Sequence, residues 1–86
     1  MISRTIIVEA EHGLHARPVS ELVKLAKTLK ATVLLSSSGK QVKAASMLGI
    51  LSLGLKKGTE LVISAEGDDE QEAVDAIASF ISSIKE

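Results

Sequence analysis

The stretch EHGLHARPVS concentrates residues that could carry out phosphoryl chemistry. His15 precedes Arg17 by two positions, and Gly13 and Pro18, the only proline in the chain, flank the pair. A helical pattern begins at Ala16, so His15 stands at the amino end of a helix, where unpaired N–H groups and a partial positive charge attract anions. A neutral imidazole is a nucleophile near its unperturbed pKa of about 6.5, and guanidinium donors suit phosphate oxygens. The combination indicates a histidine that can be phosphorylated.

The same residues also have a plainer interpretation. A histidine can simply cap a helix beside a solvated arginine, and an isolated H-x-R pattern does not separate the two. His12 lies in the same loop, but Leu14 stands two residues after it where an arginine would be needed. We therefore assign His12 no catalytic role.

Hydrophobic periodicity predicts the elements that must position this stretch. Strands are expected over residues 4–10, 31–37, 40–45 and 59–67, and helices from Ala16, over 46–54 and over 68–84. The core-facing side chains are expected to be Ile6, Val8, Val19, Leu22, Val23, Ala26, Leu29, Val33, Leu35, Val42, Ala44, Leu61, Ile63, Ala65, Val74, Ile77, Ala78, Ile81 and Ile84. The order βαββαβα predicts an α+β fold, a four-stranded antiparallel sheet with three helices on one face.

Turn and cap residues mark several boundaries. Gly39 within SSGK predicts a hairpin turn. Ser46 is a plausible N-cap of the short middle helix, and Gly54 closes that helix. Asp68 or Asp69 is expected to cap the last helix, whose first turn is acidic, as the helix dipole favours.

Composition limits the function classes. The 86 residues form a single domain, residues 1–86, and contain no cysteine, which excludes disulfides, thiolate metal sites and a cysteine nucleophile. The lack of cysteine also fits the cytoplasm, where we expect the protein to be located. No apolar run reaches the roughly 20 residues that a membrane helix needs, so we expect no membrane insertion. Residues 12–57 hold eight basic residues and one acid, whereas residues 60–86 hold eight acids and one lysine. The basic part favours an anionic partner, but without aromatic platforms nucleic acid is not expected.

The histidine stretch resembles a known motif. GLHARP is similar to the active-site motif of HPr, the histidine-containing phosphocarrier of the bacterial sugar phosphotransferase system. The similarity continues through KAASMLGILSLGL and KGTELVISAEGDDEQEAV and covers essentially the whole chain. The resemblance implies the HPr-like open-faced β-sandwich.

The resemblance also implies roles for individual residues. His15 would accept a phosphoryl group on Nδ1 from phospho-Enzyme I, itself charged by phosphoenolpyruvate, and pass it to the IIA component of a sugar permease. Arg17 would contact the phosphoryl oxygens. The chain would be a carrier and not an enzyme, with no cofactor and no metal, and a monomer would suit rapid exchange between partners.

A docking surface is implied on the two helices beside this site. Arg17 and Lys24 are seven residues apart and so share a helical face. An adaptable methionine and leucine patch edged by lysines would suit several acidic partners. The matching partner-binding positions are Ser20, Lys24, Lys27, Met47, Leu48 and Leu51.

Ser46 has a second expected role besides capping. In HPr of Firmicutes the matching serine is phosphorylated by an ATP-dependent HPr kinase, and the product is a corepressor for the catabolite control protein. Phosphoserine adds a charge of about −1.5 to −2, which should repel acidic partners. SMLGILSLG resembles this Gram-positive form, with Gly49 matching the pattern.

Three alternatives stay open at this point. The chain could serve the nitrogen-related branch of the phosphotransferase system, against which the Ser46 segment argues. It could be a purely regulatory binding module of the HPr fold, although such relatives lack the histidine that matches His15. A ferredoxin-like metal-binding module is disfavoured because two histidines in one loop make a poor site. His12 departs from the small polar residue that the family more often carries there.

Overall fold

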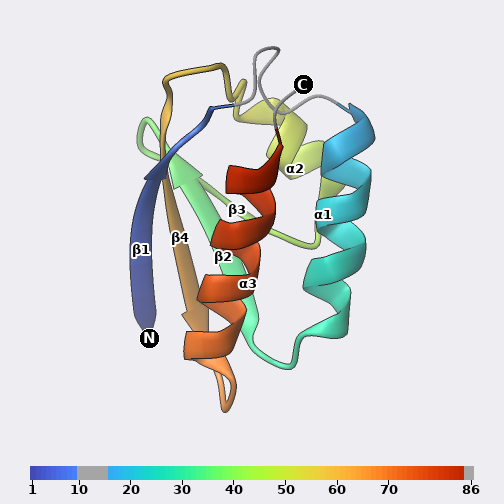
Figure 1. Cartoon of the computed structure of the whole chain (residues 1–86), viewed down its shortest axis with the longest axis vertical. Coiled ribbons are helices and arrows are strands. Elements are labelled where there is room, and N and C mark those ends of the chain that lie inside the picture. The colour runs from blue at the N-terminus through green and yellow to red at the C-terminus, as the bar shows by residue number, and fades with distance from the viewer. Residues whose placement is uncertain (10–15, 85–86) are drawn as a thin grey trace.

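The computed structural model describes residues 1–9 and 16–84. A four-stranded antiparallel sheet has the strand order β1-β4-β2-β3. In Figure 1, α1 and α3 lie side by side over one face of this sheet, and α2 lies beside α1 at one end. The elements along the chain are β1 (Ile2–Ile7), α1 (Ala16–Thr28), β2 (Thr32–Ser37), β3 (Lys40–Lys43), α2 (Met47–Ser52), β4 (Glu60–Glu66) and α3 (Glu70–Ser83).

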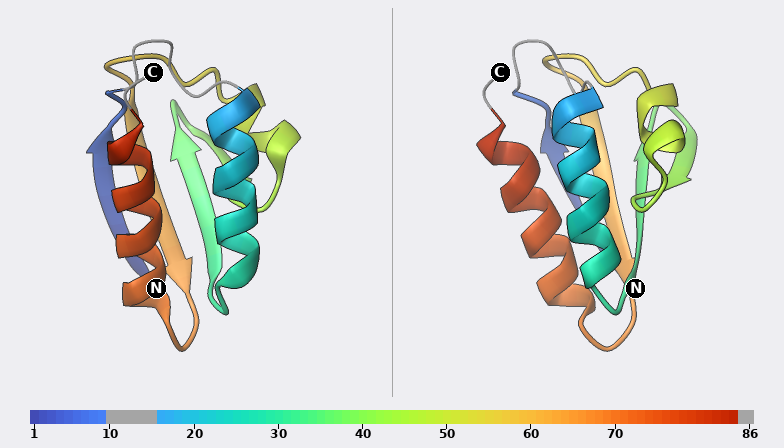
Figure 2. Two further views of the ribbon diagram at one scale, coloured as in Figure 1. Left: turned by 45° about the vertical axis from the view of Figure 1, so that its right-hand side comes forward. Right: turned by 90° about the vertical axis from the view of Figure 1, so that its right-hand side faces the viewer.

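An aliphatic core lies between the sheet and the helices. Alternate residues of the central strand β4, namely Leu61, Ile63 and Ala65, are buried, because successive strand side chains point to opposite faces. Helix α3 covers β1 and β4, and α1 packs between α3 and α2 (Figure 2). None of the described helices lies on the other face of the sheet, where the hydroxyl oxygens of Ser3 and Ser64 lie 3.0 Å apart across β1 and β4. This arrangement confirms the predicted α+β fold.

The core residues follow the predicted pattern with small departures. Val42, Leu29 and Ile84 are only partly buried, although they pack against the core. The remaining expected core positions are buried, apart from Ile6, which is half-buried. Strand β1 begins at Ile2, before the predicted residue 4, and β3 ends at Lys43. Backbone hydrogen bonding determines where these strands end, and the spacing of hydrophobic residues alone does not predict it.

The β2–β3 hairpin closes through a two-residue turn. Ser37 pairs with Lys40, which leaves Ser38 and Gly39 at the tip. Both tip residues have positive φ, 52° and 80°, as a type I′ turn requires. The hairpin predicted from Gly39 is therefore confirmed.

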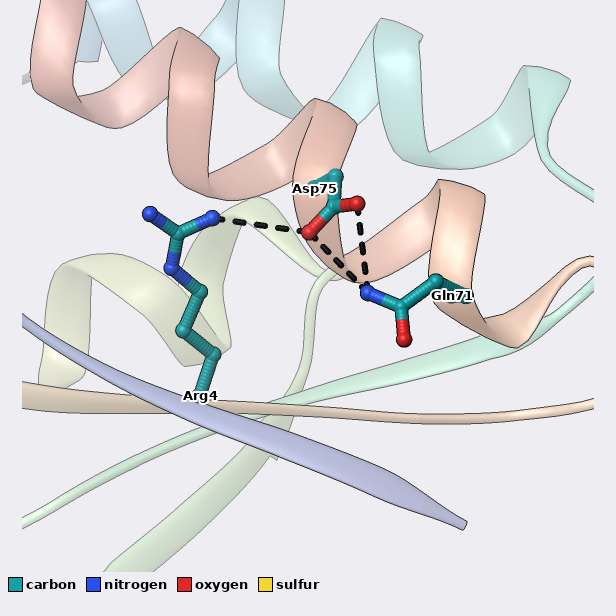
Figure 3. Close-up of polar contacts among 3 residues, drawn as sticks. All are labelled: Arg4, Gln71 and Asp75. Carbon is teal, nitrogen blue, oxygen red and sulfur yellow. Dashed lines mark hydrogen bonds and ion pairs between the residues drawn. The ribbon is translucent and has the colours of Figure 1, made fainter.

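Strand β1 is fastened to α3 by polar contacts at the surface. Arg4 Nη1 lies 3.4 Å from Asp75 Oδ1, and Gln71 Nε2 donates to both carboxylate oxygens of Asp75 at 3.2 Å (Figure 3). The Met1 amino group lies 3.2 Å from Glu70 Oε2. The Arg4 and Asp75 side chains are each 54% exposed, so this ion pair contributes at most about 1 kcal/mol. The β1–β4 ladder, and not these pairs, holds the strand.

Asp69 occupies the predicted N-cap position of α3 but does not cap the helix with its side chain. Its Oδ2 instead accepts a hydrogen bond of 3.1 Å from the backbone N–H of Lys30, at the α1–β2 connection. Gly67 lies against the same connection, with φ +147°, and a Cβ there would stand 2.9 Å from Ala31 Cα. Together these residues join two turns at the end of the molecule opposite the start of α1.

Candidate functional site

Helix α1 is anchored by its buried face from its first turn onward. Val19 and Leu22 are fully buried, and Pro18 is buried in the first turn, where a missing N–H breaks no helical hydrogen bond. Arg17 is exposed in the same turn. Helix α1 thus carries the Arg17 guanidinium at its N-terminus, the end that was predicted from the sequence to bind an anion.

The charge at the start of α1 runs against the usual preference of helices. Acidic side chains favour a helix N-terminus and basic ones oppose it, each by about 0.3–1 kcal/mol. The first turn of α3 follows this rule with Glu70 and Glu72. The first turn of α1 has no acid and carries Arg17 instead. The helix dipole and Arg17 both contribute positive charge there. This charge destabilises the helix slightly but favours a bound anion.

His15 and His12 lie outside the described residues, as does the rest of the segment 10–15. Chain connectivity places His15 directly before Ala16, the first residue of α1. The structure therefore locates Arg17 and the helix N-terminus, while the orientation of the His15 ring stays a prediction.

Ser46 caps α2 as expected. Its Oγ accepts a hydrogen bond of 3.1 Å from the backbone N–H of Gly49, and its carbonyl accepts from Ile50 N at 3.0 Å. A Cβ on Gly49 would lie 3.0 Å from both Ser46 Oγ and Val42 Cβ, so glycine allows α2 to begin close to β3. Ser46 Oγ takes part in the capping bond only as an acceptor. A phosphate ester at this oxygen would therefore still allow it to accept the hydrogen bond from Gly49 N.

The predicted docking residues lie on two adjacent helices. On α1, Lys24 and Lys27 are exposed and Ser20 is half-buried. On α2, Leu48 is 83% exposed and Leu51 36%, whereas Met47 is partly buried and packs against the core. Helices α1 and α2 pack against each other (Figure 2). The fold thus places an exposed leucine pair on one helix beside two lysines and Arg17 on the next.

Comparison with known proteins identifies the family. A family model described as "PTS HPr component phosphorylation site" matches residues 2–83. The phosphocarrier protein HPr of Borreliella burgdorferi is 40% identical over 86 residues, all of both chains. The chain belongs to the HPr family of phosphocarrier proteins.

Other HPr-family proteins resemble the chain in sequence and structure. The HPr-like protein Crh of Bacillus subtilis is 37% identical over 81 residues, 94% of this chain and 95% of Crh. A crystal structure of HPr from Thermoanaerobacter tengcongensis superposes with a TM-score of 0.91 at 40% identity, covering 96% of this chain and 93% of that one. A second structure from the same organism, described as an HPr dimer, gives a TM-score of 0.75 and covers 96% of this chain and 95% of that one. The family therefore includes dimers, and the monomer stays a prediction.

Val8 was predicted as a core residue, but its hydrogen-bond partners before the histidine segment, Gly58 and Thr59, were not singled out from the sequence. Val8, the last buried residue before that segment, accepts a 2.7 Å hydrogen bond from Gly58 N and donates a 2.9 Å bond to Thr59 O. The sequence signal for this turn was the glycine of KKGT, directly before the predicted strand, because glycine often occupies the third position of a turn.

Proposed function

We propose that this HPr-family protein accepts a phosphoryl group on His15 from phospho-Enzyme I and passes it to IIA components of sugar permeases. The observation that carries the proposal is the match of the phosphorylation-site family model to residues 2–83, which span the GLHARP motif. The exposed Arg17 at an α1 terminus without acidic residues supports the same chemistry.

The transfer needs little from the protein beyond a nucleophile and fixed positive charge. The lone pair of the neutral His15 Nδ1 attacks phosphorus, the bond from phosphorus to the donor group of Enzyme I breaks, and a P–N bond forms on the ring. Arg17 and the N–H groups of α1 stabilise the negative charge spread over the phosphoryl oxygens in the transition state. The same contacts remain on phosphohistidine. A IIA nucleophile can then attack the phosphorus, and the P–N bond to His15 breaks as the new bond to IIA forms.

Docking is proposed to use the neighbouring surface of α1 and α2. Leu48 and Leu51 would supply apolar contact, and Lys24 and Lys27 would attract an acidic partner. Ser20 and Met47 lie at the same helix pair and complete the surface. An exposed leucine pair edged by lysines suits brief encounters with Enzyme I and with IIA in turn.

Regulation at Ser46 is proposed as a second layer. A phosphate on Ser46 keeps the oxygen that accepts from Gly49 N and adds negative charge directly beside Met47 and Leu48. That charge repels an acidic partner without unfolding α2. We expect an HPr kinase with ATP to give acid-stable label on the native protein and none on Ser46→Ala, and an active kinase that leaves the native protein unlabelled contradicts this part.

A second candidate function is a regulatory binding module of the HPr fold. The similarity to Crh favours keeping it, since Crh at 37% identity is nearly as similar to this chain as the HPr relatives, which are 38–40% identical. His15 distinguishes the two, because the resemblance implies that purely regulatory members lack that histidine.

The test of the proposal is incubation with Enzyme I and radiolabelled phosphoenolpyruvate. We expect acid-labile label on the native protein and on His12→Ala, and no label on His15→Ala. Label that persists on His15→Ala would show that another residue accepts the phosphoryl group.

A further inference from the structure

The pairing of β1 with β4 ends in a β-bulge. The regular register runs from Ile2 opposite Ala65 to Ile7 opposite Glu60. At the next step two residues, Gly58 and Thr59, stand opposite Val8, because Val8 N donates to Thr59 O at 2.9 Å while Val8 O accepts from Gly58 N at 2.7 Å. One extra residue on the β4 side therefore interrupts the ladder.

The bulge is built from a tight turn that requires glycine. Thr59 N donates to Lys56 O at 3.0 Å, and Lys56 N donates to Thr59 Oγ1 at 3.2 Å. Gly58 has φ +88°, and Ser38 is the only non-glycine residue with positive φ in the described part of the chain. The turn is thus of type II, with Gly58 in the left-handed position, and this glycine is also the first bulge residue.

The bulge lies where the strand leaves the sheet toward the histidine segment. Val8 is 1% exposed and is held by both of its backbone hydrogen bonds. Glu9 follows it and is exposed, and the segment 10–15 leads from there to Ala16 at the start of α1. Bulges at sheet edges end strand pairing and redirect the chain, and they are frequent beside active sites.

We propose that the Lys56–Thr59 turn positions the His15 segment, with Gly58 as the positioning residue; this inference rests on the proposed phosphorylation of His15. The left-handed backbone at Gly58 aims its N–H at Val8 O and so sets the point and direction at which the chain leaves β1. Helix α1 sets the other end. Both described ends of the histidine segment, Val8 and the start of α1, are thus held by the fold.

Gly58→Ala tests the inference, and Gly39→Ala is its matched control. Both glycines have similar φ, +88° and +80°, and a Cβ at either position meets nothing within 4 Å. We expect a similar loss of stability in the two variants. Only Gly58→Ala should lower kcat for phosphoryl transfer from Enzyme I, by roughly tenfold or more, since misplacing a reacting group by about 1 Å can cost 100-fold. KM should stay unchanged, because the docking helices are not altered.

Two further variants keep the test decisive if Gly58→Ala folds poorly. Gly58→Asn should restore most of kcat, because asparagine tolerates the left-handed region. Thr59→Val removes the oxygen that accepts from Lys56 N and should lower kcat by a smaller factor. Equal kcat in all of these variants and the native protein, or an equal loss in Gly39→Ala, overturns the inference.

A readout that needs no phosphoryl transfer separates this inference from the proposed function. The imidazole ring signals of His15 are recorded by NMR at one pH in the native protein, Gly58→Ala and Gly39→Ala. The inference predicts that only Gly58→Ala shifts these signals, because only that variant displaces the ring. Unchanged His15 signals in Gly58→Ala overturn the positioning role, whereas absence of Enzyme I labelling on the native protein overturns the proposed function alone.

Discussion

At the residue scale, Arg17 lies where helix electrostatics oppose it. Its charge adds to the positive end of α1, while α3 shows the opposite and more stable choice of Glu70 and Glu72 in its first turn. Pro18 and Val19 hold the turn in place by burial, so Arg17 is not needed for packing. An exposed basic residue that costs helix stability supports the proposal that Arg17 binds an anion.

This argument predicts a trade between stability and function at Arg17. Arg17→Glu should raise the free energy of unfolding by about 0.5 kcal/mol, because it reverses an unfavourable charge at the helix N-terminus. The same change should lower phosphoryl transfer by at least about 100-fold, since one fixed transition-state donor is worth that much. Urea unfolding and initial transfer rates measure the two effects. Loss of stability in Arg17→Glu would show that the guanidinium has a structural role.

Gly67 illustrates a residue whose importance only the folded chain reveals. Nothing in SAEGDD shows that this glycine meets Ala31, or that Asp69 turns away from its own helix to Lys30, 39 residues earlier. Local rules correctly placed Asp69 at the start of α3. They could not predict its partner, because that contact depends on how two distant turns pack.

Gly67→Ala should therefore destabilise the fold more than Gly39→Ala does. At Gly39 the cost is the left-handed backbone alone, about 1 kcal/mol. At Gly67 a contact of 2.9 Å with Ala31 Cα adds to a φ of +147°, so we expect a loss of about 2–4 kcal/mol. Urea midpoints of the two variants give the comparison. Equal midpoints would mean that the two turns separate readily.

At the element scale, α2 carries apolar side chains for which the core has limited room. Ile50 is its one fully buried residue, and Leu48 projects into solvent. Periodicity alone does not decide which residues of so short a helix face inward. The burial of Ile50 and the exposure of Leu48 follow from the contacts of α2 with α1 and β3, which no local pattern specifies. The Ser46 cap, by contrast, was predictable because its partner Gly49 is three residues away.

Leu48→Ala should weaken docking and leave the fold intact. Removal of an 83%-exposed side chain costs little stability. If Leu48 is one of the few interface residues that matter for binding, its truncation costs about 1–2 kcal/mol of binding. We expect KM for Enzyme I to rise by roughly 5- to 30-fold with kcat nearly unchanged. Ile7→Ala is the control, since Ile7 is 50% exposed on β1 and lies away from α2. A similar KM in both variants would place the docking surface elsewhere.

At the scale of the whole molecule, the charge asymmetry of the sequence becomes an asymmetry in space. The exposed lysines Lys24, Lys27, Lys40 and Lys43 belong to α1 and β3, whereas exposed Glu72 and Asp75 belong to α3. Helix α3 covers β1 and β4, and β3 is the opposite edge of the sheet. The protein thus has a basic side, which includes the α1 lysines of the proposed docking surface. Sequence order alone indicated two charged parts, and the topology separates them.

Transfer from Enzyme I should accordingly depend on ionic strength. Added salt screens the attraction between the basic side and an acidic partner, so kcat/KM should fall as salt rises. The double variant Lys24→Gln, Lys27→Gln should lower kcat/KM at low salt and flatten the salt dependence. Glu72→Gln on α3 should leave the slope unchanged. A steep slope that survives loss of both lysines would contradict electrostatic steering by α1.

The most direct measurement follows the phosphoryl group through the complete relay. Enzyme I, this protein and a IIA component are incubated with radiolabelled phosphoenolpyruvate, and label on IIA is followed over time. The account predicts rapid label on IIA with the native protein and only background label with His15→Ala, although that variant keeps the native urea midpoint. Equal labelling of IIA in the presence of His15→Ala would contradict the claim that this histidine carries the phosphoryl group.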